Sequence, residues 1–301
     1  MEEENWLTRR FEENRPFLRG VAYRMLGSLS EAEDAVQEAW LRLNGIDAAS
    51  IENLTGWLMT VVSRVCLDML RSRKLRRESP MSADVTDRAV AHAQGAHPEA
   101  EALLAEATGV ALLVVLHALT PAERLAFVLH DVFAMPFEEI GRVLDRSAAA
   151  AKQLASRARR RVHGSHTRLE GDQARQRELV ESFMTATRTG DLNALLALLD
   201  PDAVIHIDAA ARANDPNATE LGKPRELRGA ATFIDGFIAR VRGLRFVEPA
   251  LIDGSVGVIL APLGKLTRAF LFTFERNRIA RIDVIGDKSR LRQLEITVLS
   301  S

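Results

Sequence analysis

The apolar positions of residues 120–161 recur with a helical period in three successive segments. Thr120 and Glu123 flank a proline and an alanine, which is the pattern of a capping box at a helix N-terminus. A second, short helix begins at Pro136, and Ser147 is a suitable N-cap for a third. Two helices joined by such a short turn form a helix-turn-helix, a motif that binds DNA in many proteins.

The third helix of this segment has two chemically different faces. One face carries small apolar residues, as close packing against another helix requires: Ala151, Ala155, Ala158 and Val162. The other face and the preceding turn supply the candidate DNA contacts: Arg146, Ser147, Ala149, Lys152, Gln153, Ser156, Arg157 and Arg160. Glutamine can pair with adenine, and arginine or lysine can bind guanine or phosphate. The alternative is a solvated basic helix, because cations also suit the C-terminal end of the helix dipole.

Helical patterns also fill residues 5–77. A first amphipathic helix ends near Gly27, and Ser30 with Glu33 predicts a capping box for the second. A third helix follows and ends in a strongly basic segment near Arg77. The polar, proline-flanked segment after it predicts a flexible linker, so we expect two small helical domains that can move apart.

The pattern changes after residue 172 to a mixture of helices and strands. Two helices, a strand near His206 and a further helix over 230–241 precede four strand-like runs. Asp253-Gly254 predicts a two-residue hairpin between the first two runs, and Arg276-Asn277 predicts a weaker one between the last two. Helices followed by an antiparallel meander predict an α+β domain, in which a curved sheet wrapped on helices leaves a pocket.

Composition and charge limit the number of domains and exclude several kinds of protein. The chain has 301 residues, 47% of them hydrophobic, and a formal net charge of −1. Two or three packed domains are therefore expected, and any DNA affinity must come from local basic patches. The one cysteine, Cys66, lies in an apolar helical pattern, which excludes a disulfide framework and a zinc cluster and fits a reducing cytoplasm. The charged N-terminus predicts no signal peptide, no apolar run has the length of a membrane span, and we expect no metal and no cofactor.

Several segments together resemble one family. Region 2 of the extracytoplasmic-function (ECF) sigma factors of bacterial RNA polymerase resembles two stretches of this chain, FLRGVAYRMLG at 17–27 and AEDAVQEAW at 32–40. The helix-turn-helix resembles region 4 of the same family. The remainder resembles the SnoaL-like, nuclear-transport-factor-2-type domain that some of these factors carry. The order of the parts is more specific than any one motif, and it implies two all-α sigma domains followed by an α+β cone.

The resemblance implies that region 2 has two partners. An acidic and amide face beside an aromatic residue would dock on the clamp helices of the polymerase β′ subunit: Asp34, Gln37, Glu38 and Trp40. A polar loop and the following basic helix would bind the −10 promoter element: Asn53, Thr55, Trp57, Arg64, Arg71, Arg73, Lys74 and Arg76. Asn53 is equally suited to capping the helix, and Trp57 to packing in the core. Region 4 would read the −35 element next to the polymerase β flap.

The C-terminal domain has candidate pocket residues without a complete catalytic set: His206, Asp208, Asp235 and Asp283. His206 and Asp208 alternate on one predicted strand, so they would share a face and suit an acid–base pair. The alternative is polar residues on the open side of an ordinary strand. The best-known SnoaL-fused factors carry a glycine-rich DGGG segment where this chain has DAAA at 208–211, which indicates a neighbouring subgroup. We expect a regulatory domain rather than an enzyme, one that contacts the two sigma domains.

The predicted organisation places region 2 at 1–78, a linker at 79–98, region 4 at 99–163, a second linker at 164–172 and the C-terminal domain at 173–301. Within region 4, a helix over 99–118 leads into the helix-turn-helix. The expected function is a sigma factor that binds core RNA polymerase and directs initiation under the control of its C-terminal domain. One alternative is a polymerase-independent regulator that senses a small ligand, and another is a SnoaL-class enzyme with a DNA-binding arm. Whether an anti-sigma partner exists is unknown from the sequence.

Overall fold

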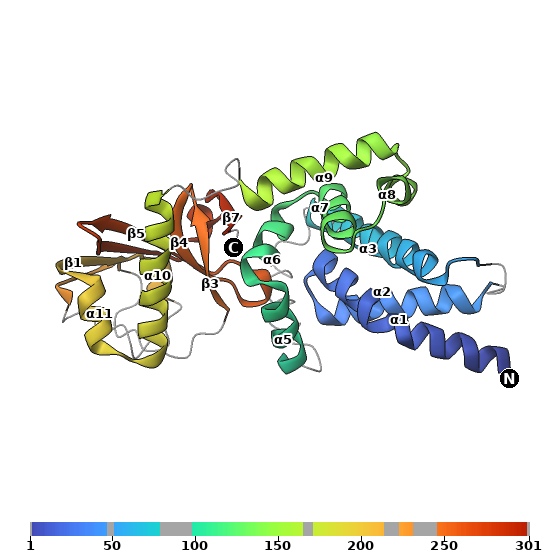
Figure 1. The fold of residues 1–301 in the computed structure, drawn as a ribbon, viewed down its shortest axis with the longest axis horizontal. Helices are drawn as coiled ribbons and strands as arrows, with labels where there is room; N and C mark the ends of the chain where they lie inside the picture. The colour runs from blue at the N-terminus through green and yellow to red at the C-terminus, as the bar shows by residue number, and fades with distance from the viewer. Residues whose placement is uncertain are drawn as a thin grey trace. The chain divides into compact units, whose positions relative to one another are not determined.

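The computed structural model describes residues 2–46, 51–78, 98–164, 171–213, 223–230 and 246–299 (Figure 1). The chain separates into two compact units. The first unit comprises Met1–Thr108 and Leu116–Arg161, and the second comprises Gly109–Val115 and Val162–Ser301. The predicted linker at 79–98 and the predicted helix at 230–241 lie outside the described residues, apart from Pro98 and Ala230.

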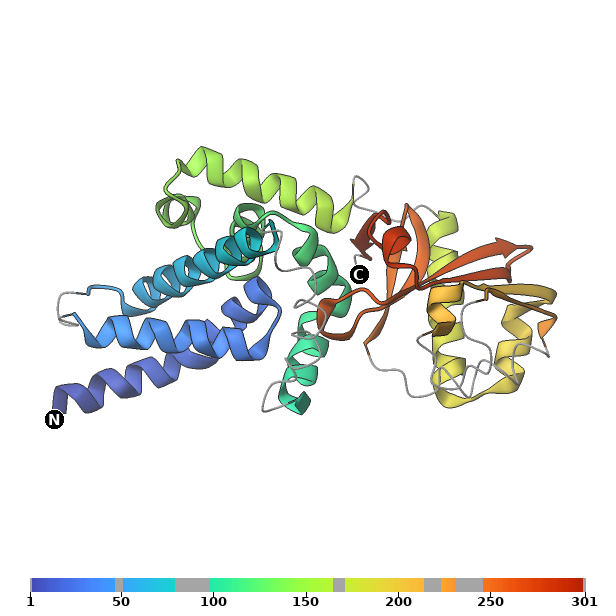
Figure 2. The same cartoon turned by 180° about the vertical axis from the view of Figure 1, so that it is seen from behind.

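Three helices form the N-terminal bundle, which Figure 2 shows from behind: α1 (Glu2–Leu26), α2 (Leu29–Asn44) and α3 (Leu54–Glu78). Their apolar faces make a core in which Leu18, Tyr23 and Leu58 are fully buried. Gly27 ends α1 with φ +72, as the sequence predicts. The predicted capping box at Ser30 is wrong, because α2 already begins at Leu29 and its N-cap, Ser28, makes no side-chain hydrogen bond.

Cys66 lies in the core of this bundle, where its side chain is fully buried. Burial among apolar groups raises the pKa of the Cys66 thiol to about 12. The thiol is therefore protonated and unreactive at neutral pH, as the core position predicted from the sequence requires.

The helix-turn-helix segment follows two further helices. The elements are α5 (Pro98–Thr108), α6 (Val110–Ala118), α7 (Pro121–Phe127), a π-helical turn η2 (Val128–Val132), α8 (Phe137–Leu144) and α9 (Ala148–His163). The predicted single helix over 99–118 is broken at Gly109, whose φ of +87 suits glycine. The capping box at Thr120 is confirmed: its hydroxyl accepts a hydrogen bond from Glu123 N–H, and the Glu123 carboxylate accepts one from Thr120 N–H.

The C-terminal domain is built on one mixed sheet of seven strands in the order β2-β1-β6-β5-β4-β3-β7. The strands are β1 (Leu199–Ile207), β2 (Arg225–Arg228), β3 (Val247–Ile252), β4 (Ser255–Leu260), β5 (Arg268–Glu275), β6 (Arg278–Ile285) and β7 (Ile296–Val298). The described helices are α10 (Gly171–Thr189), α11 (Leu192–Leu198), α12 (Ala209–Ala213), the 3₁₀ turn η3 (Pro262–Gly264) and α14 (Lys288–Leu291). The predicted α+β class is confirmed.

The predicted meander is also confirmed, since β3 to β6 pair antiparallel with their chain neighbours. Both predicted hairpin turns have the two positive φ angles that a type I′ turn requires, at Asp253-Gly254 (+50 and +80) and Arg276-Asn277 (+48 and +65). The pairing of β1 with β6 is parallel. The short edge strands β2 and β7 are absent from the sequence prediction, because a run of three or four residues carries too little periodicity.

The two faces of this sheet bury different residues. One face packs against α10 and α11 through residues that include Val180, Phe183 and Leu195. The other face packs against the first turns of α6, where Val110 and Ala111 are buried on side chains from β3 to β6. No single helix in the described part of the chain is long and apolar enough to span a membrane, although the bent pair formed by α5 and α6 passes the same test by length and composition.

Candidate nucleic-acid interface

The turn between α8 and α9 is held by one glycine and one left-handed residue. Asp145 adopts φ +54 and ψ +46, and Arg146 N–H donates a hydrogen bond to the Gly141 carbonyl at 2.8 Å. A Cβ on Gly141 would lie 2.7 Å from the Arg146 carbonyl oxygen, so a larger side chain at this position would push the turn away. The Ser147 hydroxyl accepts a hydrogen bond from Ala150 N–H at 3.2 Å, which confirms its capping role.

The two predicted faces of α9 are present. Its small residues are buried, with exposed fractions of at most 1% at Ala151, Ala155, Ala158 and Val162. The candidate DNA contacts are exposed to solvent: Arg146, Ser147, Ala149, Lys152, Gln153, Ser156, Arg157 and Arg160. Within the described part of the chain, the cations at 152, 157 and 160 have no ion-pair partner, so their charges are available to an external anion.

Two other arginines of α9 are engaged with the protein. Arg159 pairs with Asp131 at 2.6 Å, and Arg161 pairs with Glu123 of the capping box at 3.3 Å. These ion pairs tie the C-terminal half of α9 to η2 and α7. The helix therefore separates its basic residues into a free set on the outer face and a paired set that fixes its position.

The candidate −10 residues lie in the loop before α3 and along α3 itself. Asn53 accepts a hydrogen bond from Gly56 N–H at 3.0 Å and caps α3, while Thr55 donates to Asn14 at 2.9 Å and Trp57 is half-buried. Arg64 and Arg71 are exposed on the outer side of α3.

Two of these arginines bind groups of the protein. The Arg64 guanidinium donates to the Arg142 carbonyl at 3.0 Å, and Arg73 donates to the Leu26 carbonyl at 3.2 Å and also pairs with Glu31. The side chains of Lys74 and Arg76 lie outside the described residues. Arg71 pairs with Asp68 at 3.4 Å. The described arginines of α3 therefore all have partners in the protein, with Arg64 and Arg71 on its exposed side and Arg73 turned inward.

The candidate polymerase-binding residues lie along α2. Asp34 and Gln37 are exposed, and Glu38 pairs with Arg42 at 2.9 Å. Trp40 packs its ring on Phe11 of α1, with centroids 4.7 Å apart. Leu41 is 59% exposed on the same helix. The sequence analysis did not include it, although an apolar side chain that breaks the helical period of a buried face was the available signal.

The candidate pocket residues of the C-terminal domain do not form the predicted arrangement. Asp208 lies beyond the end of β1, so the prediction that His206 and Asp208 alternate on one strand is wrong. The Asp208 carboxylate instead accepts hydrogen bonds from Ala211 N–H (2.6 Å), Gly286 N–H (2.9 Å) and Asp287 N–H (3.0 Å). It therefore caps α12 and fixes the chain that leaves β6.

His206 pairs with a different carboxylate, Asp283 of the neighbouring strand β6, at 3.6 Å. Asp283 also accepts two hydrogen bonds of 2.8 Å from Arg281, which raise the pKa of that guanidinium. Ile205 belongs to the core, so His206 lies on the opposite face of the sheet. The fourth candidate, Asp235, lies outside the described residues.

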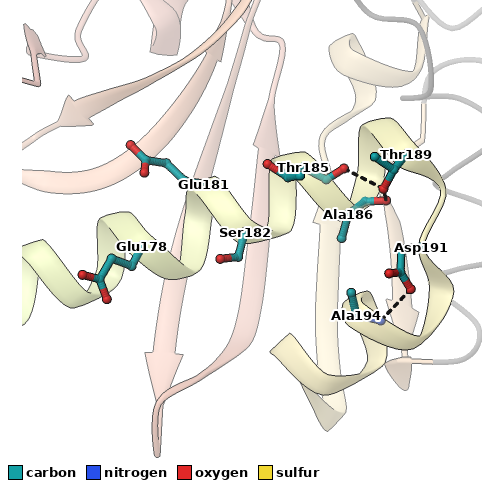
Figure 3. Close-up of a pocket in the computed structure, with 8 residues that line it drawn as sticks. All are labelled: Glu178, Glu181, Ser182, Thr185, Ala186, Thr189, Asp191 and Ala194. Atoms are coloured by element: carbon teal, nitrogen blue, oxygen red, sulfur yellow. Dashed lines mark hydrogen bonds between the residues drawn. The ribbon is translucent and has the colours of Figure 1, made fainter.

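The domain has a shallow cavity of about 410 Å³ between α10 and α11 (Figure 3). It is lined by Glu178, Glu181, Ser182, Thr185, Ala186, Thr189, Asp191 and Ala194. His206, Asp208 and Asp283 are not among these lining residues, and Figure 3 shows Asp191 bonded to Ala194 N–H as the cap of α11. Among the described residues, no group of His, Cys, Asp and Glu side chains could hold a metal ion.

A helix-turn-helix with exposed cations, preceded by a three-helix bundle, is an arrangement typical of a DNA-binding transcription factor. The family model for sigma-70 region 2 matches residues 10–76, and that for sigma-70 region 4 matches residues 109–162. The ECF RNA polymerase sigma factor SigJ of Mycobacterium tuberculosis (strain ATCC 25618 / H37Rv) is 40% identical over 256 residues, which cover 84% of this chain and 80% of that protein. The chain therefore belongs to the extracytoplasmic-function sigma factors of RNA polymerase.

Two further comparisons complete the picture. The probable ECF RNA polymerase sigma factor SigI of M. tuberculosis (strain CDC 1551 / Oshkosh) is 37% identical over 196 residues, 65% of this chain and 68% of that protein. The crystal structure of M. tuberculosis SigJ aligns with a TM-score of 0.45 at 32% identity and covers 95% of this chain and 98% of that chain.

Proposed function

We propose that this sigma factor reads the −35 element with the exposed face of α9 and the −10 element with α3 and the loop before it. The observation that carries the proposal is the division of the α9 cations into a free set and a paired set. Free cations at 152, 157 and 160 suit phosphates and guanine, and Gln153 between them suits adenine. The modest size of this patch fits a protein that binds DNA only when polymerase holds it.

The α2 helix is the proposed docking site for the β′ clamp helices of core RNA polymerase. Asp34 and Gln37 present polar groups, and Leu41 adds an exposed apolar side chain one turn further along the helix. An apolar anchor ringed by polar residues is the usual composition of a strong protein contact. The same proposal places region 4 beside the β flap and the whole protein in the cytoplasm, where core polymerase acts.

The C-terminal domain is proposed to control region 4 through the first turn of α6. The segment Gly109–Val115 belongs to the C-terminal unit, and the region 4 match begins at residue 109. The Glu248 carboxylate accepts a hydrogen bond from Ala111 N–H at 2.9 Å, and Val110 and Ala111 are buried on the sheet. A carboxylate at a helix N-terminus stabilises the helix, so this contact would let the C-terminal domain act on α6, the helix with which the region 4 match begins.

Run-off transcription with core RNA polymerase on promoter templates tests the two contact surfaces separately. Asp34→Ala with Leu41→Ala is expected to weaken co-purification with core polymerase at least tenfold. Arg157→Ala is expected to leave co-purification unchanged and to lower transcript from the cognate promoter. Arg161→Ala is the matched control for α9, because it removes the same charge from the paired set. Equal transcript losses in the two arginine variants would contradict the assigned DNA face.

A second experiment tests control by the C-terminal domain. Glu248→Ala removes the cap of α6, and Glu275→Ala removes an exposed carboxylate from the end of β5 as a control. Glu248→Ala is expected to change the run-off yield several-fold, and Glu275→Ala is expected to leave it unchanged. Indistinguishable yields for the two variants, with both proteins folded, would rule out control through this contact.

A further inference from the structure

Two asparagines bind the polar groups at the start of α3 that we assign to the −10 element. Asn53 Oδ1 accepts a hydrogen bond from Gly56 N–H at 3.0 Å, and Asn14 Oδ1 of α1 accepts one from the Thr55 hydroxyl at 2.9 Å. The Asn14 Nδ2 group donates to the Arg10 carbonyl at 2.8 Å. Each asparagine is thus bound to a main-chain group whose hydrogen-bonding role cannot change.

The side-chain amide of Asn53 has one orientation. A backbone N–H can only donate, so the atom that faces Gly56 N–H must be the Asn53 oxygen. The Nδ2 group is then the part of the amide that remains for a ligand, and it can only donate. Gly56 permits this arrangement, because a Cβ there would lie 2.8 Å from Asn53 Nδ2. Asn53 therefore presents a hydrogen-bond donor at the exposed surface of the loop.

The hydroxyl of Thr55 is fixed by the same reasoning, through Asn14. A backbone carbonyl can only accept, so the Arg10 carbonyl faces the Asn14 Nδ2 group and Asn14 Oδ1 faces Thr55. Thr55 must then donate its single proton to Asn14. Only the lone pairs of the hydroxyl oxygen remain for a ligand, so the exposed Thr55 presents an acceptor.

A donor and an acceptor of fixed polarity suit the edge of an unstacked base. Residues 51–56 contain no lysine or arginine, so this loop is not built to bind phosphate. On the pairing edge, adenine and cytosine carry an amine beside a ring nitrogen that accepts, whereas guanine and thymine carry a carbonyl oxygen beside a ring N–H. Bases of equal size therefore have opposite polarity at these two positions. A loop of fixed polarity can distinguish adenine from guanine, or cytosine from thymine, which shape alone cannot do.

We propose that Asn14 is a positioning residue for −10 recognition, which takes the Thr55 proton and thereby makes the loop distinguish bases of equal size. The inference rests on the proposed function of the loop before α3. Asn14 acts through Thr55 and lies on α1, outside the loop and outside α3. Without Asn14 the Thr55 hydroxyl is free to rotate and can either donate or accept. The discrimination is then lost, while Asn53 still caps α3.

Competition binding with the holoenzyme tests the role of Asn14. The full chain bound to core RNA polymerase is titrated with forked promoter DNA in which each unpaired −10 base is exchanged for the base of equal size. The parent is expected to distinguish the two bases at one position by about tenfold to hundredfold. Asn14→Ala is expected to reduce this ratio about threefold or more. Asn14→Asp, which keeps an acceptor for Thr55, is expected to retain the ratio.

Thr60→Val is the matched control, because it removes another hydroxyl of α3, one that donates to the Gly56 carbonyl at 2.9 Å. It is expected to leave the base preference unchanged. An unchanged preference in Asn14→Ala would overturn the inference, even if that variant unfolds at a lower temperature, because the bond to Thr55 would then only tie α1 to α3.

A double-mutant cycle identifies the base group that the Thr55 oxygen binds. The preferred base is replaced by an analogue without its hydrogen-bond donor, which is expected to weaken binding to the parent about tenfold and to have no further effect on Thr55→Val. Coupling of Thr55 to a base acceptor instead would overturn the inference. Promoter binding that Thr55→Val weakens, without any preference between bases of equal size, would overturn the inference alone. Promoter binding that neither Thr55→Val nor Asn53→Ala affects would overturn the proposed function of the loop.

Discussion

The outer face of α9 and the charged residues His206, Arg281 and Asp283 of the C-terminal sheet differ in whether their charges are paired within the protein. On α9, the cations at 152, 157 and 160 have no ion-pair partner among the described residues. On the sheet, His206 and Arg281 both bind Asp283, and Asp208 accepts three backbone hydrogen bonds. Charges without a protein partner are available for a ligand, whereas paired charges hold the fold together. The comparison supports the proposed DNA contact of the helix and a structural role for His206, Asp208, Arg281 and Asp283.

The largest expected effect comes from removing a structural carboxylate. Asp208→Ala leaves three N–H groups without their acceptor and is expected to destabilise the C-terminal domain by about 2 to 4 kcal/mol. Thermal or denaturant unfolding measures this loss, and Asp202→Ala, which removes an exposed carboxylate from the fourth residue of β1, serves as control. A fully stable Asp208→Ala protein would show that the carboxylate is free for another role and would remove the contrast with α9.

On α9, a substitution is expected to weaken binding without lowering stability. Arg157→Ala should reduce promoter affinity of the polymerase complex by about 1 to 3 kcal/mol, or roughly tenfold to hundredfold. Titrations at several salt concentrations should show a slope reduced by about one if Arg157 binds a phosphate, and an unchanged slope with relaxed sequence preference if it binds a base. A change in melting temperature comparable to that of Asp208→Ala would contradict the assignment.

Ser147 has both a structural role and a proposed binding role, because its hydroxyl caps α9 at the proposed DNA surface. Ser147→Ala is expected to cost about 1 kcal/mol of stability through loss of the hydrogen bond to Ala150 N–H. Ser147→Asp keeps a capping oxygen but adds a negative charge, so it should preserve stability and weaken promoter binding. Circular dichroism melts and promoter titrations separate the two outcomes. If both variants lose stability and promoter binding to the same extent, the capping role of Ser147 could not be separated from its proposed role at the DNA surface.

The smallest expected effect is at His206. The His206–Asp283 pair is partly exposed, with side chains 33% and 29% accessible, and such pairs contribute about 0 to 1 kcal/mol. His206→Ala should therefore change neither unfolding nor run-off transcription measurably. A large loss of transcript, or of small-molecule binding measured by calorimetry, would show that His206 and Asp283 have a functional role.

Features that depend on near neighbours in the sequence could be predicted. The capping box at Thr120, the cap at Ser147 and the turns at Asp253-Gly254 and Arg276-Asn277 are set by hydrogen bonds and φ angles within a few residues. The small face of α9 follows in the same way from helical periodicity. Because the same periodicity places the remaining residues on the outer face of α9, its exposed residues could be named from the sequence.

Features that depend on distant residues could not be predicted. The box at Ser30 was wrong because Glu101, far along the chain, caps α2 and lets the helix begin earlier. Asp208 was misplaced because its partners Gly286 and Asp287 come from the other end of the domain. Only the fold shows that His206 is opposite Asp283 in the parallel pair of β1 and β6.

The cap of α2 by Glu101 also has a consequence during synthesis of the chain. The two partners are 72 residues apart, and a ribosome adds about 5 to 20 residues per second. The N-terminus of α2 is therefore synthesised about 4 to 14 s before its acceptor, and the α1–α3 bundle, which ends at Glu78, is complete in sequence for only about the last 1 to 5 s of that time. During that interval we expect a frayed first turn in α2, so region 2 is fully capped only after α5 has been synthesised.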